Sequence, residues 1–441
     1  MSSAPAPTSE PTGVAHSMPI AYAARALSAD GSLPSQRPQS PWIVVLVSAL
    51  GYFVDVLDLF LFNVFRVPSL KDLGVAQEQL LTVGANLINI QMLGLLVGAF
   101  VWGILGDRKG RVRALYGSIV LYSLATLANA LVTSLPAYAL CRLLAGLGLA
   151  GELGAAIALV SETLSQKQRG LGTALVAGLG LCGGIAAALL AELVAWRTAY
   201  VVGGLCGLAL LLLRVRLRES ALFDALSDRP HTPIQRGSLR LLFASSQRRG
   251  MYFRLALLGL PVWFVAGILM VFSPEFARAL DVPGITAGRC ILFSYLGTAI
   301  GDVGSGLLSQ ALSSRKRVLL LFLFLVAGTV TAFLFARGVS SAGLYAVCFA
   351  LGVSTGYWAV LVTTAAEHFG TNLRATVATT IPNIVRASII PLNLAFSALL
   401  PRLGIRAAAL WLGAGCLLLA LVSLRGLRET FTQDLNFHEH S

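Results

Sequence analysis

Residues 103–113 read GILGDRKGRVR and separate two long apolar segments, residues 82–106 and 112–133. The glycines permit a tight turn, and Asp107 can be held by an arginine or by the positive N-terminal end of the helix that follows. The basic residues would keep such a loop on the cytoplasmic side of a membrane. The stretch therefore predicts a short connection between two membrane-spanning helices.

The composition supports a membrane protein. The chain has 441 residues, of which 56% are hydrophobic and 12% charged, and its mean hydropathy is +0.78. A soluble domain carries about 25% charged residues. The apolar runs are continuous rather than alternating, which excludes a β-barrel and favours helices, because helices satisfy their own backbone polar groups in lipid. We expect an all-α polytopic membrane protein, monomeric in the lipid bilayer.

Segments long enough to cross a membrane recur along the chain. A spanning helix needs about 20 residues, and twelve apolar segments meet this length. They are residues 42–66, 82–106, 112–133, 136–162, 170–195, 196–217, 251–279, 286–312, 316–337, 339–366, 373–400 and 404–425. The longest internal hydrophilic stretch separates the sixth segment from the seventh, so the layout is six plus six.

This layout predicts five regions and a duplication. The regions are a disordered cytoplasmic tail (1–41), an N-terminal six-helix bundle (42–217), a cytoplasmic linker (218–250), a C-terminal six-helix bundle (251–425) and a cytoplasmic tail (426–441). Residues of the first half recur at one constant offset in the second: Gly151, Glu162 and Arg169 return as Gly356, Glu367 and Arg374. Transporters are commonly built from such repeats. We therefore predict twelve transmembrane helices in two pseudo-symmetric bundles.

The positive charge indicates orientation rather than nucleic-acid binding. A net charge of +13 and a pI near 9.9 could suggest a nucleic-acid partner, but the charges lie between apolar segments, and we expect none. About 23 of the 33 Lys and Arg residues lie in the tails and even-numbered loops, and about 8 in the odd-numbered loops. By the positive-inside rule both termini are cytoplasmic, in a plasma membrane such as a bacterial inner membrane.

Asp55 and Asp58 are the strongest polar signal of the first half. An acid near the centre of a spanning helix costs about 2.5–3.5 kcal/mol. Spaced i, i+3, the two carboxylates share a helix face, and their repulsion favours one of them holding a proton near neutral pH. We expect proton coupling here, although an acid that pairs with an arginine to orient helices is the alternative. Glu152, near mid-depth of the fourth segment, is the third proton candidate.

The fourth segment also contains a formal GxGxxG pattern, Gly146 to Gly151. No short strand precedes it and no acid follows about 20 residues on, so a dinucleotide site is not supported. A second match, Gly178 to Gly183, has the same defect. Small residues that let helices approach closely explain both.

Polar residues elsewhere in the apolar segments are substrate candidates. Arg386 stays charged when buried and suits a carboxylate or phosphate; it could instead pair with Asp302 and bind nothing. The substrate-binding candidates are Arg142, Arg386, Asp302, Asn63 and Asn89. No nucleophile, base and orienting group share a motif, so we expect no enzyme. We also expect no cofactor, and no metal because the cysteines lack metal-ligand spacing.

The stretch at 103–113 resembles the signature loop of the major facilitator superfamily almost residue for residue. The resemblance covers about residues 42–430 and implies a gating network. Its members are Asp107, Arg108, Arg111, Glu162 and Arg169, with Glu367 and Arg374 in the second half. The second copy of the loop has Gln310 where the acid is expected, which argues against symmetric gating.

A finer resemblance concerns the branch. Residues 142–152 follow the pattern RxxxGxGxxGE and resemble the metabolite:proton symporters and the sugar-porter-like branch. This implies a secondary active transporter, with proton-coupled uptake of a small polar metabolite such as an organic acid by alternating access. Proton-driven efflux is the alternative, disfavoured because the glycine-rich fifth segment lacks proline. A non-transporting receptor on the same fold is the alternative from another class.

Overall fold

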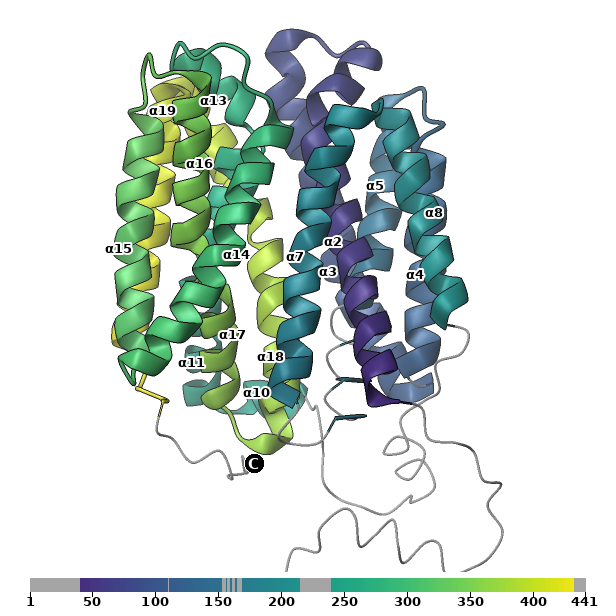
Figure 1. Ribbon diagram of the computed structural model, residues 1–441, viewed down its shortest axis with the longest axis vertical. Coiled ribbons are helices and arrows are strands. Elements are labelled where there is room, and N and C mark those ends of the chain that lie inside the picture. The colour runs from purple at the N-terminus through teal and green to yellow at the C-terminus, as the bar shows by residue number, and fades with distance from the viewer. Residues whose placement is uncertain are drawn as a thin grey trace, which may run out of the picture. The chain divides into compact units, whose positions relative to one another are not determined.

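The computed structural model describes residues 40–109, 111–152, 156, 159–160, 163–164, 169–214 and 239–431. Nearly all of them are helical, and no strand occurs among them. From Pro41 onward they belong to one unit. Figure 1 shows the helices of the first half, purple to teal, beside those of the second half, green to yellow.

Among the described residues of the first half there are six long helices. They are α2 (Pro41–Asp72), α3 (Leu80–Lys109), α4 (Arg111–Asn129), α5 (Leu135–Leu149), α7 (Arg169–Leu193) and α8 (Trp196–Arg214), with a 3-10 turn at Gln77–Gln79 before α3. α2 runs to Asp72 and not to residue 66 as expected from hydropathy, because Arg66 and Ser69 are fully buried and find polar partners.

The second half is more interrupted. Its helices are α10 (Leu239–Ala244), α11 (Ser246–Leu258), α12 (Leu260–Phe264), the π-helix η2 (Val265–Met270), α13 (Ser273–Ala279), α14 (Ala287–Ala311), α15 (Arg315–Leu334), α16 (Ser341–Thr355), α17 (Trp358–Glu367), α18 (Thr371–Ala387) and α19 (Ile389–Arg425). α10 and the start of α11 lie within residues 218–250, which we expected to be linker.

The interruptions have local causes. Pro261 lies in the first turn of α12, and the π-helix η2 follows α12 directly. The tenth spanning segment breaks between α16 and α17 at Gly356, where a Cβ would come within 2.4 Å of the Gly301 backbone. α19 contains a further break at Gly404, whose φ of +72° suits glycine. The break at Gly404 separates the eleventh expected segment from the twelfth, whereas the breaks near Pro261 and Gly356 fall within expected spans, where an interrupted helix leaves backbone polar groups available.

The pattern of burial is that of a protein in lipid. Eight described helices are long and apolar enough to span a membrane; one range, Thr380–Arg425, joins the end of the eleventh expected segment to the twelfth. Large apolar side chains such as Leu212 and Phe324 point outward, whereas Arg66, Arg142 and Arg214 are fully buried. Together with the family described below, this confirms the all-α polytopic fold.

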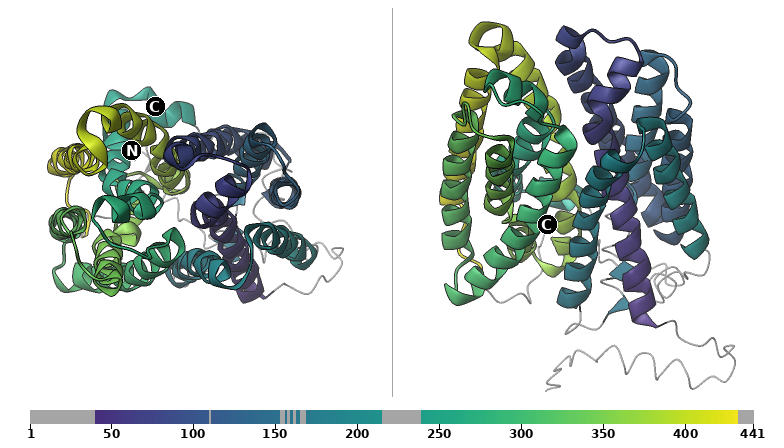
Figure 2. Two further views of the ribbon diagram at one scale, coloured as in Figure 1. Left: turned by 90° about the horizontal axis from the view of Figure 1, so that it is seen from above. Right: turned by 45° about the horizontal axis from the view of Figure 1, so that its top comes forward.

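The two halves contact each other through a few helices. α7 packs against α14, α2 also touches α14, and α3 touches α18 and α19; Figure 2 shows α7 and α14 side by side between the halves. α2 begins, and α19 ends, at the lower end of Figure 1. We call this end the termini face and the other the opposite face.

Candidate functional site

A cavity lies between the two halves and is lined by both. Its lining residues are Tyr52, Val56, Leu59 and Phe60 of α2, Leu181 of α7, Val262, Trp263, Val265 and Ala266 of the seventh segment, Ser294, Tyr295, Thr298 and Asp302 of α14, and Thr355, Trp358 and Arg386 of the tenth and eleventh segments. Arg386 and Asp302 are its charged groups. The remaining wall is largely aromatic and aliphatic, so the cavity suits a small molecule with an apolar body and an anionic group.

Arg386 reaches across from the second half to α2. Its Nη2 donates a hydrogen bond to the Tyr52 hydroxyl at 2.9 Å, and its Nη1 lies 3.5 Å from Oδ2 of Asp55. The guanidinium also sits 5.6 Å from the centre of the Tyr52 ring. All three side chains are buried. The ion pair of Arg386 is thus with Asp55, and the Arg386–Asp302 pair that we considered from the sequence is wrong.

Asp302 has a different partner. Its Oδ1 accepts the backbone N–H of Ala359 at 3.1 Å, at the start of α17. The break at Gly356 leaves the first N–H groups of α17 without partners in the helix, and Asp302 satisfies one of them. The carboxylate therefore holds the broken helix and at the same time lines the cavity.

Asp58 makes its contacts within the first bundle and not with Arg386. Its Oδ1 accepts a hydrogen bond from Thr126 at 2.6 Å, and the charge of Arg142 acts on it. Arg142 donates to Asn129 at 3.2 Å and lies over the Tyr200 ring at 4.8 Å. The two acids, neighbours in sequence, belong to separate polar networks.

Glu152 forms an ion pair inside the first bundle. Its Oε1 lies 2.8 Å from Nη1 of Arg214, and both side chains are almost completely buried. Gly51 of α2 makes room for the pair, because a Cβ there would come within 1.8 Å of Arg214. The sequence analysis did not find Arg214 as the partner of Glu152, because Arg214 lies near the end of the sixth segment, residues 196–217.

The asparagine candidates lie outside the cavity wall. Asn89 of α3 accepts a hydrogen bond from Asn393 of α19 at 2.9 Å, which joins the two halves. Asn63 is buried in α2 and is not among the lining residues.

A second ion pair between the halves was missed by the sequence analysis. Arg66, near the end of α2, contacts both carboxylate oxygens of Glu275 in α13 at 2.7 and 2.8 Å. It also donates to the carbonyls of Leu80 and Val271, at 3.0 and 3.1 Å, and its guanidinium lies over Phe272. The pair joins α2 of the first half to α13 of the second. The only signal in the sequence was an arginine at the edge of an apolar segment.

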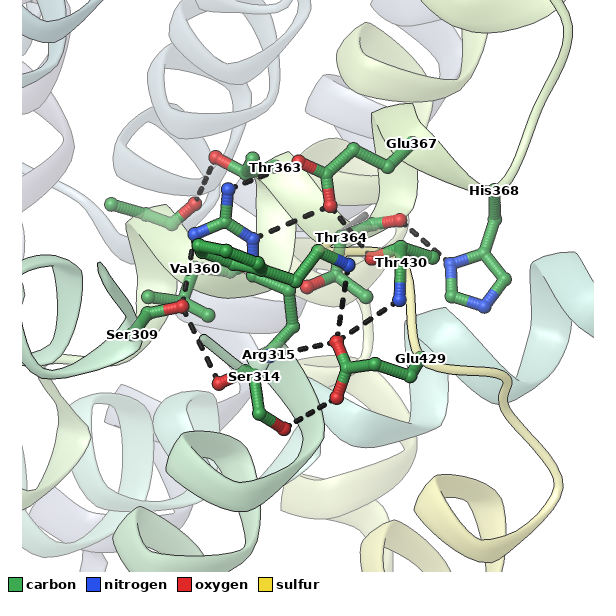
Figure 3. A network of polar contacts seen from close by, with 12 residues as sticks. Ser309, Ser314, Arg315, Val360, Thr363, Thr364, Glu367, His368, Glu429 and Thr430 are labelled. Atoms are coloured by element: carbon green, nitrogen blue, oxygen red, sulfur yellow. Dashed lines mark hydrogen bonds and ion pairs between the residues drawn. The ribbon is translucent and has the colours of Figure 1, made fainter. Parts of the chain in front are cut away.

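The termini face of the second half carries a further network (Figure 3). Glu367 pairs with Arg315 at 3.1 Å and accepts a hydrogen bond from Thr430 at 2.6 Å. Glu429 accepts the hydroxyl of Ser314 and the backbone N–H of Arg315 at 2.9 Å, so it caps α15. Glu429, from the C-terminal segment, thus supplies a carboxylate at the start of α15. The acid that the family loop would carry near the end of α14 is replaced there by Gln310.

Hydrogen bonds set the titration of Glu429. Burial alone would raise its pKa, but the hydrogen bonds from Ser314 and from the backbone N–H groups of residues 315, 316 and 431 outweigh burial, so its pKa lies below the ordinary value.

The rest of the expected gating network is incompletely described. Helical backbone is described for Asp107, Arg108, Arg111, Arg169 and Arg374, but not their side chains, and Glu162 lies outside the described residues.

The arrangement defines a class. Two helical halves that share one cavity at interrupted helices, with buried charges contributed from both sides, form a membrane transporter. The chain belongs to the Major Facilitator Superfamily, whose family model matches residues 48–387. It is therefore a multi-pass membrane transporter and not an enzyme.

Individual relatives are named as transporters of small organic molecules. Over 352 residues the chain is 26% identical to the putative niacin/nicotinamide transporter NiaP of Bacillus subtilis, covering 77% of this chain and 84% of that one. Over 301 residues it is 33% identical to the 3-(3-hydroxy-phenyl)propionate transporter of Escherichia coli, covering 65% and 70%. The solved structure of a D-xylose-proton symporter superposes with a TM-score of 0.66 at 16% identity, covering 88% of this chain and 98% of that one, which supports the fold.

Proposed function

We propose that the chain takes up a small aromatic monocarboxylate together with a proton, by alternating access. The observation that carries this proposal is the contact of Arg386 with Asp55 and Tyr52 across the two halves, in the wall of the cavity. Arginine stays charged even when buried, and an unpaired buried charge is strongly destabilising. Arg386 therefore always needs an anion beside it.

This need couples proton to substrate. In the empty transporter the anion is Asp55. When Asp55 takes up a proton it no longer neutralises Arg386, and the carboxylate of the substrate replaces it. The loaded transporter then holds a proton and a carboxylate together, and the empty one holds neither. Neither the loaded nor the empty transporter contains an unpaired charge, so both can change conformation. A transporter that holds only the proton or only the substrate contains an unpaired charge and cannot.

The wall supports an aromatic substrate. Phe60, Trp263, Tyr295 and Trp358 present ring surfaces around the cavity, and flat rings pack well against such surfaces. The names of the two sequence relatives, a niacin/nicotinamide transporter and a hydroxyphenylpropionate transporter, agree with this class.

Asp58 and Glu152 take other roles in this proposal. Asp58 with Arg142 is a second site for a proton inside the first bundle, and Glu152 with Arg214 holds helices together. Asn63 and Asn89 contribute to packing and to the contact between halves.

In this proposal the orientation follows from charge placement, and the gates follow from the family resemblance of residues 103–113. The termini face is cytoplasmic by the positive-inside rule, in the plasma membrane, and the transporter works as a monomer. Asp107, Arg108, Arg111, Glu162 and Arg169 form the cytoplasmic gate of the first half, and Glu367 with Arg315 and Arg374 that of the second. The contacts at Arg66 and Asn89 then close the extracellular side.

The proposal is tested in proteoliposomes with radiolabelled nicotinate and 3-(3-hydroxyphenyl)propionate. An inward proton gradient should drive accumulation by the wild type. Asp55→Asn should lose accumulation but keep exchange of internal for external substrate. In this variant Arg386 is neutralised only while the substrate carboxylate is bound, so only the substrate-bound transporter can change conformation. Asp281→Asn, in an exposed ion pair with Arg337, serves as the matched control and should behave as wild type. Gradient-driven accumulation by Asp55→Asn would sink the proposal, and accumulation only under an outward gradient would indicate efflux.

A further inference from the structure

Two glycines of α7, Gly180 and Gly184, each face the ring of a tyrosine. A Cβ at Gly180 would lie 2.0 Å from Cδ1 of the Tyr52 ring, and one at Gly184 would lie 2.8 Å from Cδ1 and Cε1 of Tyr295. Atoms essentially never approach a Cβ closer than 3.0 Å. Each glycine therefore leaves a space that one tyrosine ring fills.

Both rings belong to the cavity wall. Tyr52 accepts the hydrogen bond of Arg386, and Tyr295 meets the edge of Phe60 with ring centres 4.7 Å apart. The two tyrosines come from different halves, since Tyr52 is on α2 and Tyr295 on α14. α7 thus supports the ring of its own half at Gly180 and the ring of the other half at Gly184, although neither glycine lines the cavity.

We infer that Gly180 and Gly184 are positioning residues for substrate binding. Gly180 fixes Tyr52 where its hydroxyl can hold Arg386, and Gly184 fixes how far Tyr295 stands into the cavity, and so which size of acid fits. The inference rests on the proposed function, because it takes this cavity as the substrate site. It gives a role to Gly180, the middle glycine of the GxGxxG match at residues 178–183, and to Gly184, which follows that match.

The Tyr52 ring has little freedom to yield. Tyr52 is 8% exposed, and packed interiors transmit added volume as displacement of neighbours. A methyl at Gly180 must push the ring away from α7. A displaced hydroxyl loses its hydrogen bond to the guanidinium, and a hydrogen bond to a charged group is equivalent to about a tenfold or larger change in binding.

The first test is Gly180→Ala, assayed by proton-driven uptake of whichever of nicotinate and 3-(3-hydroxyphenyl)propionate has the lower KM in wild type. We expect KM to rise about tenfold with kcat little changed. Gly178→Ala is the matched control on the same helix, because a Cβ there meets nothing within 4 Å. It should leave KM unchanged. Equal KM values in Gly180→Ala and wild type would overturn the inference.

A double variant separates positioning from general packing. In a Tyr52→Ala background the ring is absent, so adding Gly180→Ala should cause no further rise in KM. Additive effects would contradict the inference. If Gly180→Ala alone does not reach the membrane, the double variant should restore insertion, because the methyl then occupies the space left by the ring. The unfolding temperature of the same four proteins gives a readout without substrate, and additive losses there would also contradict it.

Gly184→Ala tests the second half of the inference. Pushing Tyr295 away from α7 moves it toward Phe60 and narrows the cavity, so the KM of the larger acid, 3-(3-hydroxyphenyl)propionate, should rise more than that of nicotinate. A uniform change for both acids would refute a role in size selection. These outcomes are distinct from failure of the proposed function, in which Arg386→Gln itself would leave uptake intact.

Discussion

Three buried ion pairs can be compared in this transporter, and they differ in how firmly each arginine is held. Arg66 makes two short contacts with Glu275 and two more with carbonyls. Glu152 and Arg214 meet at 2.8 Å within one half. Arg386 touches Asp55 only at 3.5 Å and shares its hydrogen bonding with a tyrosine. The loosely held arginine is the one in the cavity wall. In the proposed mechanism the tight pairs maintain structure or close a face, and the loose pair exchanges its partner for a substrate.

The largest expected effect comes from removing the loose arginine. Arg386→Gln should reduce uptake to background, since no cation remains for the carboxylate. Arg386→Lys keeps the charge but not the planar donors, and should retain weak uptake with a raised KM. Initial rates in proteoliposomes at matched protein content measure both. Uptake by Arg386→Gln at the wild-type rate would show that the loosely held arginine does not bind the substrate carboxylate.

Breaking the tight pair within one half should cost stability. Glu152→Gln leaves Arg214 buried without a counter-charge, and removing one partner of a buried pair costs about 3–5 kcal/mol. Thermal unfolding in detergent micelles should show a lower midpoint. The double variant Glu152→Leu with Arg214→Leu should recover much of the loss. If Glu152→Gln unfolds like wild type but abolishes proton-driven accumulation, Glu152 is a proton carrier instead.

Breaking the tight pair between the halves should shift conformation. Glu275→Gln removes an ion pair that, in the proposed mechanism, holds the opposite face closed, so cysteines introduced along the cavity should react with an external thiol reagent about tenfold faster. Glu192→Gln is the matched control, because Glu192 and Arg289 also join the halves but are exposed, and exposed pairs contribute little. Equal labelling rates in the two variants would contradict the role of Arg66 as a latch.

The smallest effect concerns pH at the termini face. Because the pKa of Glu429 is lowered by folding, its contribution to stability is present above the unfolded pKa, about 4.3, and is lost as pH falls through the folded value. Exchange of the backbone amides at residues 315 and 316, corrected for intrinsic rates, should therefore quicken in acid. Glu429→Gln should abolish that pH dependence. The same acid response in the variant would assign it to another group.

The sequence predicted the fold well because each spanning helix carries its own hydropathy signal. It also identified Asp55, Arg386 and Asp302 as charged residues within spanning segments. Their pairing was not predictable, since it depends on how helices rotate and on which half faces which. Arg66 and Glu275 illustrate the limit: both lie at the ends of apolar segments, where hydropathy alone assigns a charge to a loop. The partner of Glu152 was missed for the same reason at Arg214.

The exchange of Asp55 for a substrate carboxylate can be measured directly as proton uptake on binding. Purified protein in detergent is mixed with nicotinate or 3-(3-hydroxyphenyl)propionate in weakly buffered solution at a pH where Asp55 is ionised in the empty protein, and the pH change is recorded. The account predicts uptake of about one proton per bound acid by wild type, and none by Asp55→Asn, which still binds the acid. Undiminished proton uptake by Asp55→Asn would contradict it.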